Sequence, residues 1–312
     1  MYFPYFRGRQ EELLAINEAA PNLAANRKII PVIEPVRAKV SAFVRCAQVC
    51  ASNKVRLGLV MNPAVGHLTA NHGYVLADIL AGVRDTGCNV IPFCLVHGVT
   101  TDSEIRHFLS THSSDHVGFV HFGEPTATSA ILNVFKSEQS RSIHLMVDGA
   151  CGPHYKASVT GSTRGLIRDG FRRQNRNADY TSVREFFTDL HSTYTGLGFS
   201  GFGDFLTVGI DYLEGGGAPR AIALHLTSDD NGSVYCHHFV STSNATAANR
   251  DRKYREALDA LHAFERVNPK LFHFSSAVQE FLADRAAGSP TSLGRMKRRS
   301  MKHHLELMCT LV

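Results

Sequence analysis

The sequence predicts a (β/α)8, TIM-barrel-like fold, and three observations support that class. Short apolar runs recur along the first half of the 312-residue chain, and the segments between them carry apolar residues three or four positions apart. The runs are almost continuously apolar, as is typical of parallel strands covered by helices on both faces. Eight such runs fit one barrel of this length. A doubly wound open sheet is the main competing fold, because sequence does not show whether a sheet closes.

The expected elements alternate along the chain. Strands are expected at 2–6, 29–36, 55–62, 89–96, 117–123, 143–149, 205–212 and 221–227. Helices are expected at 9–22, 40–50, 73–85, 102–109 and 126–135. A further run at 234–241 follows the turn signal Asp229-Asp230-Asn231-Gly232, so we expect it to form a hairpin with the eighth strand.

The whole chain, 1–312, is expected to form a single barrel-like domain with two additions. Residues 150–204 are expected as a basic, glycine-rich insertion after strand 6, exposed and loosely packed. Residues 249–312 are expected as a C-terminal helical extension. Because the insertion is far longer than an ordinary connection between strand and helix, we expect it to serve function.

Composition excludes several classes of protein. Hydrophobic residues make up 44% and charged residues 20%, which excludes disordered and fibrous chains. No apolar run is long enough to span a membrane, and the opening residues do not resemble a secretory signal, so we expect a cytoplasmic protein without a membrane partner. Seven cysteines without a paired spacing predict reduced thiols. No local motif of a zinc site is present.

Basic residues cluster in the expected insertion. Residues 151–184 hold seven basic and two acidic residues, a net charge of +5 that equals the excess of the whole chain. A second basic cluster, which includes Lys297, spans residues 295–302. Arginine suits phosphate contacts, so nucleic acid or another polyphosphate is a candidate ligand. A solvated surface or an acidic protein partner would explain the same residues. The candidate arginines are Arg168, Arg172, Arg173 and Arg176.

A barrel active site forms at the C-terminal ends of the strands. Polar residues at the expected strand ends are Arg7, Glu34, Asn62, His97, Glu124, Asp148 and either Asp211 or Glu214.

Three carboxylates are the catalytic candidates. Glu34 interrupts an apolar strand, Asp148 ends another, and Asp204 follows Gly-Phe-Gly at a strand entrance or lid. Desolvation disfavours a charged carboxylate, so such a residue either gains a partner or changes its pKa, and both outcomes suit acid–base or metal chemistry. The alternatives are structural. Glu34 could pair with Arg7 or Arg37, and Asp148 and Asp204 could cap turns.

Arg7, Asn62 and His225 complete the binding candidates. Asn62 stands before a proline, so a turn-forming role is the alternative. His225 and His237 lie on neighbouring expected strands and could face one another as a histidine pair at the barrel rim. The glycine-rich stretch 196–205 precedes a strand, whereas a dinucleotide-binding fingerprint follows one, so we exclude that reading.

Several longer segments carry a family resemblance. MYFPYFRGRQEELLAI, KIIPVIEPV, GFGDFLTVGIDYLEGGG with AIALHLT and HHFVS, and RMKRRSMKHHLELM resemble the beta family of bacterial and phage proteins. The resemblance runs from Met1 to about Leu311, and it is greatest to a branch whose genes often sit beside a second small gene in mobile or defence-associated regions. It implies signature positions but neither a reaction nor a cofactor. Those positions are Arg7, Gly8, Glu12, Glu34, Gly203, Asp204, His225, His238, Lys302 and His303.

The leading hypothesis is a component of a bacterial defence or mobile-element module directed at nucleic acid or phosphate. In its enzymatic form it is a metal-dependent, phosphodiesterase or nuclease-like barrel in which Glu34, Asp148 and Asp204 hold Mg²⁺ or Mn²⁺. One alternative is a non-catalytic subunit that binds a protein partner encoded by a neighbouring gene. Another is a barrel enzyme that acts on a small phosphorylated metabolite, with the insertion as a lid. Catalysis itself is left open.

Overall fold

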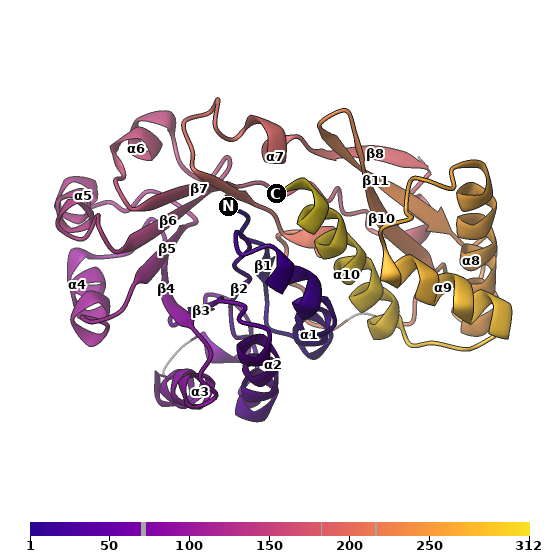
Figure 1. Cartoon of the computed structure of the whole chain (residues 1–312), viewed down its shortest axis with the longest axis horizontal. Coiled ribbons are helices and arrows are strands. Elements are labelled where there is room, and N and C mark those ends of the chain that lie inside the picture. The colour runs from indigo at the N-terminus through magenta and orange to yellow at the C-terminus, as the bar shows by residue number, and fades with distance from the viewer. Residues whose placement is uncertain (70–72, 182, 216) are drawn as a thin grey trace.

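A computed structural model describes residues 1–69, 73–181, 183–215 and 217–312. Eight parallel strands pair in one continuous order, and backbone hydrogen bonds from Phe3 N to Phe202 O (2.8 Å) and from Tyr5 N to Asp204 O (2.9 Å) join the first strand to the last. The predicted (β/α)8 class is therefore confirmed (Figure 1). In pairing order the strands are β1 (Tyr5–Phe6), β2 (Val32–Ile33), β3 (Leu57–Val60), β4 (Val90–Val96), β5 (Val117–His121), β6 (Ser142–Val147), β7 (Thr163–Ile167) and β9 (Gly201–Gly203).

Helices cover the outside of the barrel in the expected alternation. Those between barrel strands are α1 (Gln10–Ala25), α2 (Val40–Ser52), α3 (Gly73–Asp85), α4 (Asp102–Thr111), α5 (Thr128–Ser137), α6 (Pro153–Ser158) and α7 (Leu190–Thr193). The last helix, α10 (Leu293–Leu311), packs beside α1 and thereby completes the ring from the far end of the sequence. Short 3₁₀ turns occur at Gly66–Leu68, Asn177–Asp179 and Leu206–Val208.

The expected positions of the last two barrel strands are wrong. The seventh and eighth strands are β7 and β9, whereas 206–208 form a 3₁₀ turn and residues 223–227 of the expected eighth strand belong to a second sheet. β7 reads TRGLI and β9 only GFG, so neither shows the apolar run by which a buried strand is recognised. The range 150–204, of which residue 182 lies outside the described residues, therefore contains two barrel strands as well as the long connection between them.

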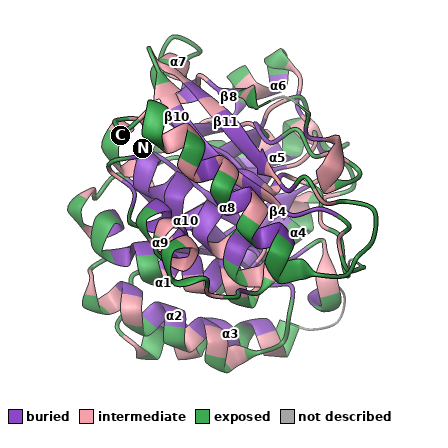
Figure 2. Cartoon of the chain, turned by 90° about the vertical axis from the view of Figure 1, so that its right-hand side faces the viewer, coloured by how far each residue is buried: buried purple, intermediate pink, exposed green. Residues whose placement is uncertain are grey.

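The second sheet is antiparallel and has the order β10-β11-β8, formed by β10 (Ala223–Asp230), β11 (Ser233–Val240) and β8 (Arg184–Thr188). The predicted hairpin is confirmed: Asn231 and Gly232 both have positive φ (53° and 82°), as a tight hairpin turn requires. α8 (Arg250–Val267) and α9 (Ser276–Ala287) lie on one side of this sheet, and α10 lies between the sheet and the barrel (Figure 1). Much of α10 is consequently buried (Figure 2).

Alternation along the strands divides the core into two layers. Phe3, Tyr5 and Phe93 fill the barrel interior, whereas Tyr2 and Phe6 face the outer helices. Two glycines make this packing possible. A Cβ on Gly203 would lie 2.2 Å from the backbone oxygen of Phe3, and one on Gly118 would lie 2.1 Å from the Phe93 ring. The glycine-rich stretch before residue 205 thus lets β9 approach β1 closely enough to close the barrel.

Candidate functional site

Five of the polar residues expected at one end of the barrel lie there, whereas Asp211 and Glu214 follow no barrel strand, because residues 205–212 do not form one. Four strands are directly followed by one of these residues: β1 by Arg7, β2 by Glu34, β4 by His97 and β6 by Asp148. One residue, Met61, separates Asn62 from the end of β3. Because all these strands are parallel, their C-terminal ends meet on one rim.

Strand alternation separates these residues into two sets. Tyr5, Val32 and Leu95 point into the barrel, so Arg7, Glu34 and His97 continue the inward-facing positions. Val147 also points inward, which places the next residue, Asp148, on the outer face. Asp204 lies two positions after the outward-facing Phe202 and is therefore on the outer face as well. The three predicted catalytic carboxylates therefore do not occupy one layer.

Glu34 is fully buried, and each of its carboxylate oxygens has two donors. Oε2 accepts a hydrogen bond from the Tyr5 hydroxyl (2.7 Å) and pairs with the Arg7 guanidinium. Oε1 accepts from the backbone N–H groups of Ala64 (2.7 Å) and Val65 (3.3 Å). The structural alternative of a salt bridge to Arg7 is thus present, and Glu34 also fastens the loop after β3.

Asp204 is also buried and connects the barrel to α10. Its Oδ1 accepts from the Tyr2 hydroxyl (2.9 Å) and the Leu206 N–H (3.0 Å), and its Oδ2 lies 3.1 Å from His304 Nε2. The sequence did not indicate His304 as its partner, because the two residues are a hundred positions apart.

Asp148 lies at the surface of the rim and pairs with two cations. Lys156 Nζ (3.1 Å) and Arg168 Nε (2.9 Å) bind its two oxygens, and Arg168 also reaches Asp189 (2.9 Å). Burial raises the pKa of Asp148, but the hydrogen bonds from Arg168 and Lys156 outweigh that effect and hold it below its ordinary value. No described contact joins two of the three carboxylates, so this geometry does not favour a shared Mg²⁺ or Mn²⁺ centre, and their catalytic role stays a prediction.

Asn62 ties two neighbouring strands together. Its Nδ2 donates to the Leu95 carbonyl (3.0 Å), and its Oδ1 accepts from the Leu95 N–H (2.7 Å). The side chain therefore extends the ladder between β3 and β4 beyond the end of β3, which is a structural use of the residue.

Two nitrogen atoms in the mouth of the barrel are buried from solvent and have no hydrogen-bond partner among the described residues: Arg7 Nε and His97 Nε2. The Arg7 guanidinium lies over the rings of Tyr5 (5.2 Å) and Phe122 (5.9 Å). His97 stacks on the same Phe122 ring, with 5.7 Å between the ring centroids. Burial lowers the pKa of His97, and the negative charge of Glu34 opposes that shift only in part. His97 is thus a neutral imidazole at pH 7 and able to act as a base.

Residues 210–213, here termed the rim segment, cross the mouth of the barrel. Ile210 packs on the interior core, and its carbonyl accepts a hydrogen bond from Arg7 Nη2 (2.7 Å). Arg173 donates to the carbonyl of residue 211 (3.4 Å), and Arg9 donates to that of residue 213. Asp169 accepts from the Ile210 N–H (2.9 Å). Three arginines and one carboxylate therefore hold the rim segment in place.

Arg9 and Arg173, which bind the rim segment, and Lys297 of α10, whose charge interacts with both of them, are here termed the rim cations. Lys297 has no hydrogen bond or ion pair with any described residue. Its side chain reaches solvent, yet desolvation by surrounding atoms and, second, the charges of Arg173 and Arg9 lower its pKa. Glu12 opposes the shift and is the smallest of the four contributions. Its carboxylate caps α1 by accepting from the Arg7 (2.6 Å) and Arg9 (3.5 Å) N–H groups.

The predicted arginine patch is not a single surface. Arg168 is paired as described, and Arg176 binds Asp179 (2.8 Å). Arg172 and Arg173 are exposed, and Arg172 has no described partner. The expectation of loose packing is wrong for the buried Phe171 and Tyr180, which contact the second sheet. Because these two aromatic rings are buried against the second sheet, they hold the connection in place although its other residues are mostly polar.

His225 lies on the second sheet, away from the barrel strands, and its predicted partner is wrong. The register of the hairpin places His238 opposite it, with 2.8 Å between the two Nδ1 atoms. His237 points to the other face of the sheet, where it contacts Ser228 (2.8 Å). The register was the missing information, since a shift of one residue exchanges the faces of a strand.

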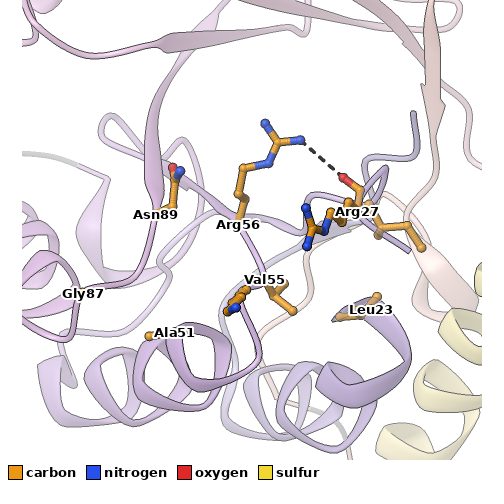
Figure 3. A pocket seen from close by; sticks show the side chains of 9 residues that line it. Leu23, Arg27, Ala51, Val55, Arg56, Gly87 and Asn89 are labelled. Atoms are coloured by element: carbon orange, nitrogen blue, oxygen red, sulfur yellow. Dashed lines mark hydrogen bonds between the residues drawn. The ribbon is translucent and has the colours of Figure 1, made fainter. Parts of the chain in front are cut away.

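A hollow of about 600 Å³ opens at the opposite, N-terminal end of the barrel (Figure 3). Its polar lining includes Arg27, Lys54 and Arg56, and Arg56 donates a hydrogen bond to the Arg27 carbonyl (3.4 Å). None of the predicted site residues lines it. Active sites of barrels of this class form at the other end, so we do not assign function to this hollow.

Comparison with protein-family models, with curated proteins and with solved structures finds no match for this chain. The resemblance to the beta family stays a prediction. Among the described helices, none combines the length and apolar character needed to cross a membrane.

Proposed function

We propose that the chain binds a phosphate-bearing small molecule at the C-terminal rim of its barrel, between the barrel and the second sheet. The observation that carries this proposal is the grouping of Lys297, which has no acceptor among the described residues, with Arg9 and Arg173; desolvation first, and then the charges of these two arginines, lower the pKa of Lys297. Like charges brought together from three separate segments repel one another. An anion bound among them relieves that repulsion.

The rim cations suit a phosphate group in particular. Arg9 and Arg173 each bind the rim segment through one terminal nitrogen. Arg9 also lies over the Tyr212 ring (4.5 Å), whereas the rest of the Arg173 guanidinium has no described partner. Arginine binds phosphate oxygens with paired, parallel N–H groups, and lysine adds a mobile point charge. Arg9 and Arg173 follow β1 and β7, and the loops after the strands are where enzymes of this architecture bind phosphorylated substrates; Lys297 joins them from α10.

This geometry favours the small phosphorylated ligand over a nucleic-acid strand. Arg168 and Arg176, which a phosphate backbone would need as part of a continuous track, are neutralised by Asp148, Asp189 and Asp179. The nucleic-acid role, the nuclease activity, the partner encoded by a neighbouring gene and the defence context stay predictions.

A catalytic use of the mouth is the second candidate, and His97 favours it. The imidazole is neutral, and its Nε2 has no partner among the described residues. A neutral imidazole at the C-terminal end of the barrel, the end at which the rim segment lies, would accept a proton from a bound substrate. Titration with pyrophosphate, followed by NMR of the His97 ring, tests whether a ligand reaches the mouth: the resonance moves if it does and stays unchanged if the anion is confined to the rim.

Isothermal titration calorimetry with inorganic phosphate and pyrophosphate tests the binding proposal. We expect Lys297→Ala and Arg173→Gln each to weaken pyrophosphate binding by about tenfold, because each removes one charge-assisted contact. Lys54→Ala, at the hollow on the opposite end, is the matched control and should leave the affinity unchanged. Loss of binding in the control with retention in Lys297→Ala would move the site to the other end. That result, or no binding at all, overturns the proposal.

A further inference from the structure

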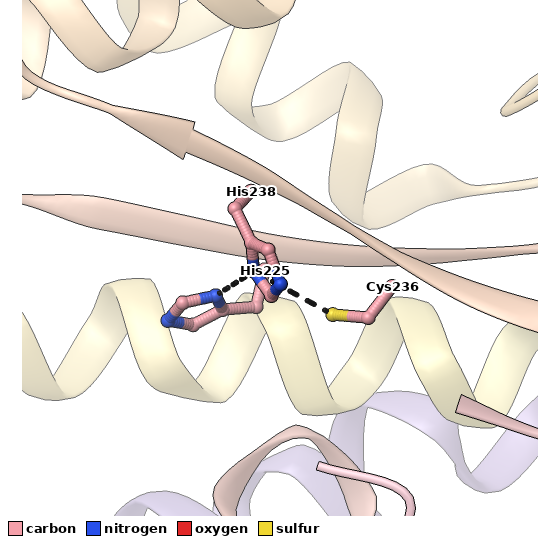
Figure 4. Close-up of side chains that lie close together, drawn as sticks. All are labelled: His225, Cys236 and His238. Atoms are coloured by element: carbon pink, nitrogen blue, oxygen red, sulfur yellow. Dashed lines mark hydrogen bonds between the residues drawn. The ribbon is translucent and has the colours of Figure 1, made fainter. Parts of the chain in front are cut away.

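Three side chains with metal-binding atoms meet on one face of the second sheet. His225 comes from β10, and Cys236 and His238 come from β11, two positions apart and therefore on the same side of the strand. His238 Nδ1 lies 2.8 Å from His225 Nδ1 and 3.9 Å from Cys236 Sγ. The three ligand atoms all lie within 4.8 Å of one another and point toward a common centre (Figure 4).

A carboxylate on the neighbouring strand orients one of these ligands. Glu185 of β8 lies with its Oε2 3.3 Å from His238 Nε2. If Nε2 carries the proton and donates it to Glu185, Nδ1 presents its lone pair to the cluster. A histidine that ligates a metal almost always has such a hydrogen-bonded partner on its other nitrogen.

The cluster is enclosed by protein. Cys236 and His238 are buried, His225 is half-buried, and the Tyr180 ring packs on both histidines at 4.7 and 4.6 Å. Phe171 contacts His225 at 4.9 Å. This hydrophobic enclosure limits the access of solvent to a bound metal.

The 2.8 Å contact between the two Nδ1 atoms is a hydrogen bond, so one of them carries a proton when no metal is bound. If His238 donates Nε2–H to Glu185, its Nδ1 is the acceptor and His225 Nδ1–H is the donor. A metal ion therefore replaces the Cys236 proton and requires the His225 proton to move to Nε2.

We propose that His225, Cys236 and His238 bind a zinc ion. Soft thiolate and imidazole ligands in this number suit Zn²⁺, and a fourth, tetrahedral position remains for a water molecule. Binding releases the Cys236 proton to solvent, and the His225 proton moves from Nδ1 to Nε2, so that both histidines offer Nδ1 to the metal and carry their proton on Nε2. The two histidine nitrogens must separate to about 3.3 Å to accommodate Zn–N bonds of about 2.0 Å, a movement of a few tenths of an ångström.

Zinc motifs in the sequence do not reveal this arrangement. Common structural sites pair ligands within short loops or one helical turn, whereas these ligands combine a Cys-x-His on one strand with a histidine on its hairpin partner. Only the register of the hairpin brings them together. A bound zinc would fix the hairpin to the aromatic residues of the connection between β7 and β8.

Metal analysis of the full chain tests the proposal. Chain purified from zinc-supplemented medium and dialysed against metal-free buffer is expected to retain about one zinc per chain by mass spectrometry. After removal of zinc by a chelator, Co²⁺ is expected to give an intense thiolate-to-metal charge-transfer band that Zn²⁺ abolishes. Both measurements use the wild-type chain, so they do not depend on a variant folding.

Variants identify the ligands. Cys236→Ser and His225→Gln are expected to lose the bound metal, and Cys236→Ser also the charge-transfer band. His237→Gln, on the same strand but the other face, and Cys94→Ser, a buried cysteine of the barrel, are matched controls expected to keep both. A wild-type chain with less than about a tenth of an equivalent of zinc and no charge-transfer band would overturn the proposal. So would a Cys236→Ser variant that retains the band.

Discussion

Glu34 illustrates how burial decides the role of a charged residue. A carboxylate removed from water must recover its hydration energy from protein donors, and Glu34 does so through Tyr5, Arg7 and the loop at residues 64–65. The sequence correctly singled out the residue, since a glutamate inside an apolar strand needs an explanation. It did not reveal that every acceptor position is already in use.

Replacing Glu34 by glutamine is therefore expected to destabilise the fold. The change leaves the mostly buried Arg7 without its counter-charge, at a cost of about 3 kcal/mol in the free energy of unfolding. Urea denaturation measures it. Glu138→Gln, which removes a more exposed ion pair with Arg141, is the control and should cost less than about 1 kcal/mol. Equal urea midpoints for Glu34→Gln and the wild type would contradict the structural role.

At the scale of single elements, the predicted first six barrel strands, the hairpin and the C-terminal helices occur where periodicity placed them. β7 and β9 were missed because a short strand closed by glycine carries almost no apolar signal. The position of α10 could not be predicted either, since its packing beside α1 depends on tertiary contacts between the two ends of the chain. For the same reason Lys297 was not recognised as a neighbour of Arg9 and Arg173.

Closure of the barrel at β9 is expected to depend on Gly203. Alanine there would place its Cβ 2.2 Å from the Phe3 backbone oxygen, which cannot move aside as a side chain can. We expect Gly203→Ala to lower the free energy of unfolding by about 2 kcal/mol or more. Gly217→Ala, where a Cβ meets open space, is the control and should have little effect. Hydrogen exchange of the β1 and β9 amides reports on closure, and unchanged protection in Gly203→Ala would refute this account.

The arginines of the connection between β7 and β8 differ in whether they have carboxylate partners, and this difference can be tested. If the chain binds DNA or RNA, Arg172 and Arg173 should contribute most, because Arg168 and Arg176 already have carboxylate partners. Replacing the first pair by glutamine is expected to reduce the slope of log K against log salt by about 2, as two phosphate contacts are lost. Replacing the second pair should change the slope less. Equal effects of the two double variants, in fluorescence titrations at several salt concentrations, would contradict this division.

Across the whole molecule, buried neutral histidines join the barrel, α10 and the second sheet. Burial lowers the pKa of His121 to about 3, of His303 to about 3 and of His237 to about 4. Their positions between packed layers explain why the chain tolerates them only without charge.

These histidines predict a loss of stability in mild acid. In the unfolded chain each binds a proton near pH 6.5, whereas the folded chain binds none until pH 4 or below. Their contribution is therefore fully present above pH 6.5 and is lost as the pH falls. Three protons correspond to about 4 kcal/mol per pH unit between pH 6 and 5. Urea denaturation at pH 7, 6 and 5 measures this dependence, and a constant unfolding free energy over that range would refute it.

The central claim is that the rim cations form an anion site, and the pKa of Lys297 tests it most directly. NMR titration of the Lys297 side chain in the free, full-length chain should give a pKa below 10.5, because desolvation and the neighbouring Arg173 and Arg9 disfavour its charge. Saturating pyrophosphate should raise that pKa, since a bound anion reverses the local field. A Lys297 pKa that pyrophosphate leaves unchanged would show that no anion binds among these residues and would contradict the account.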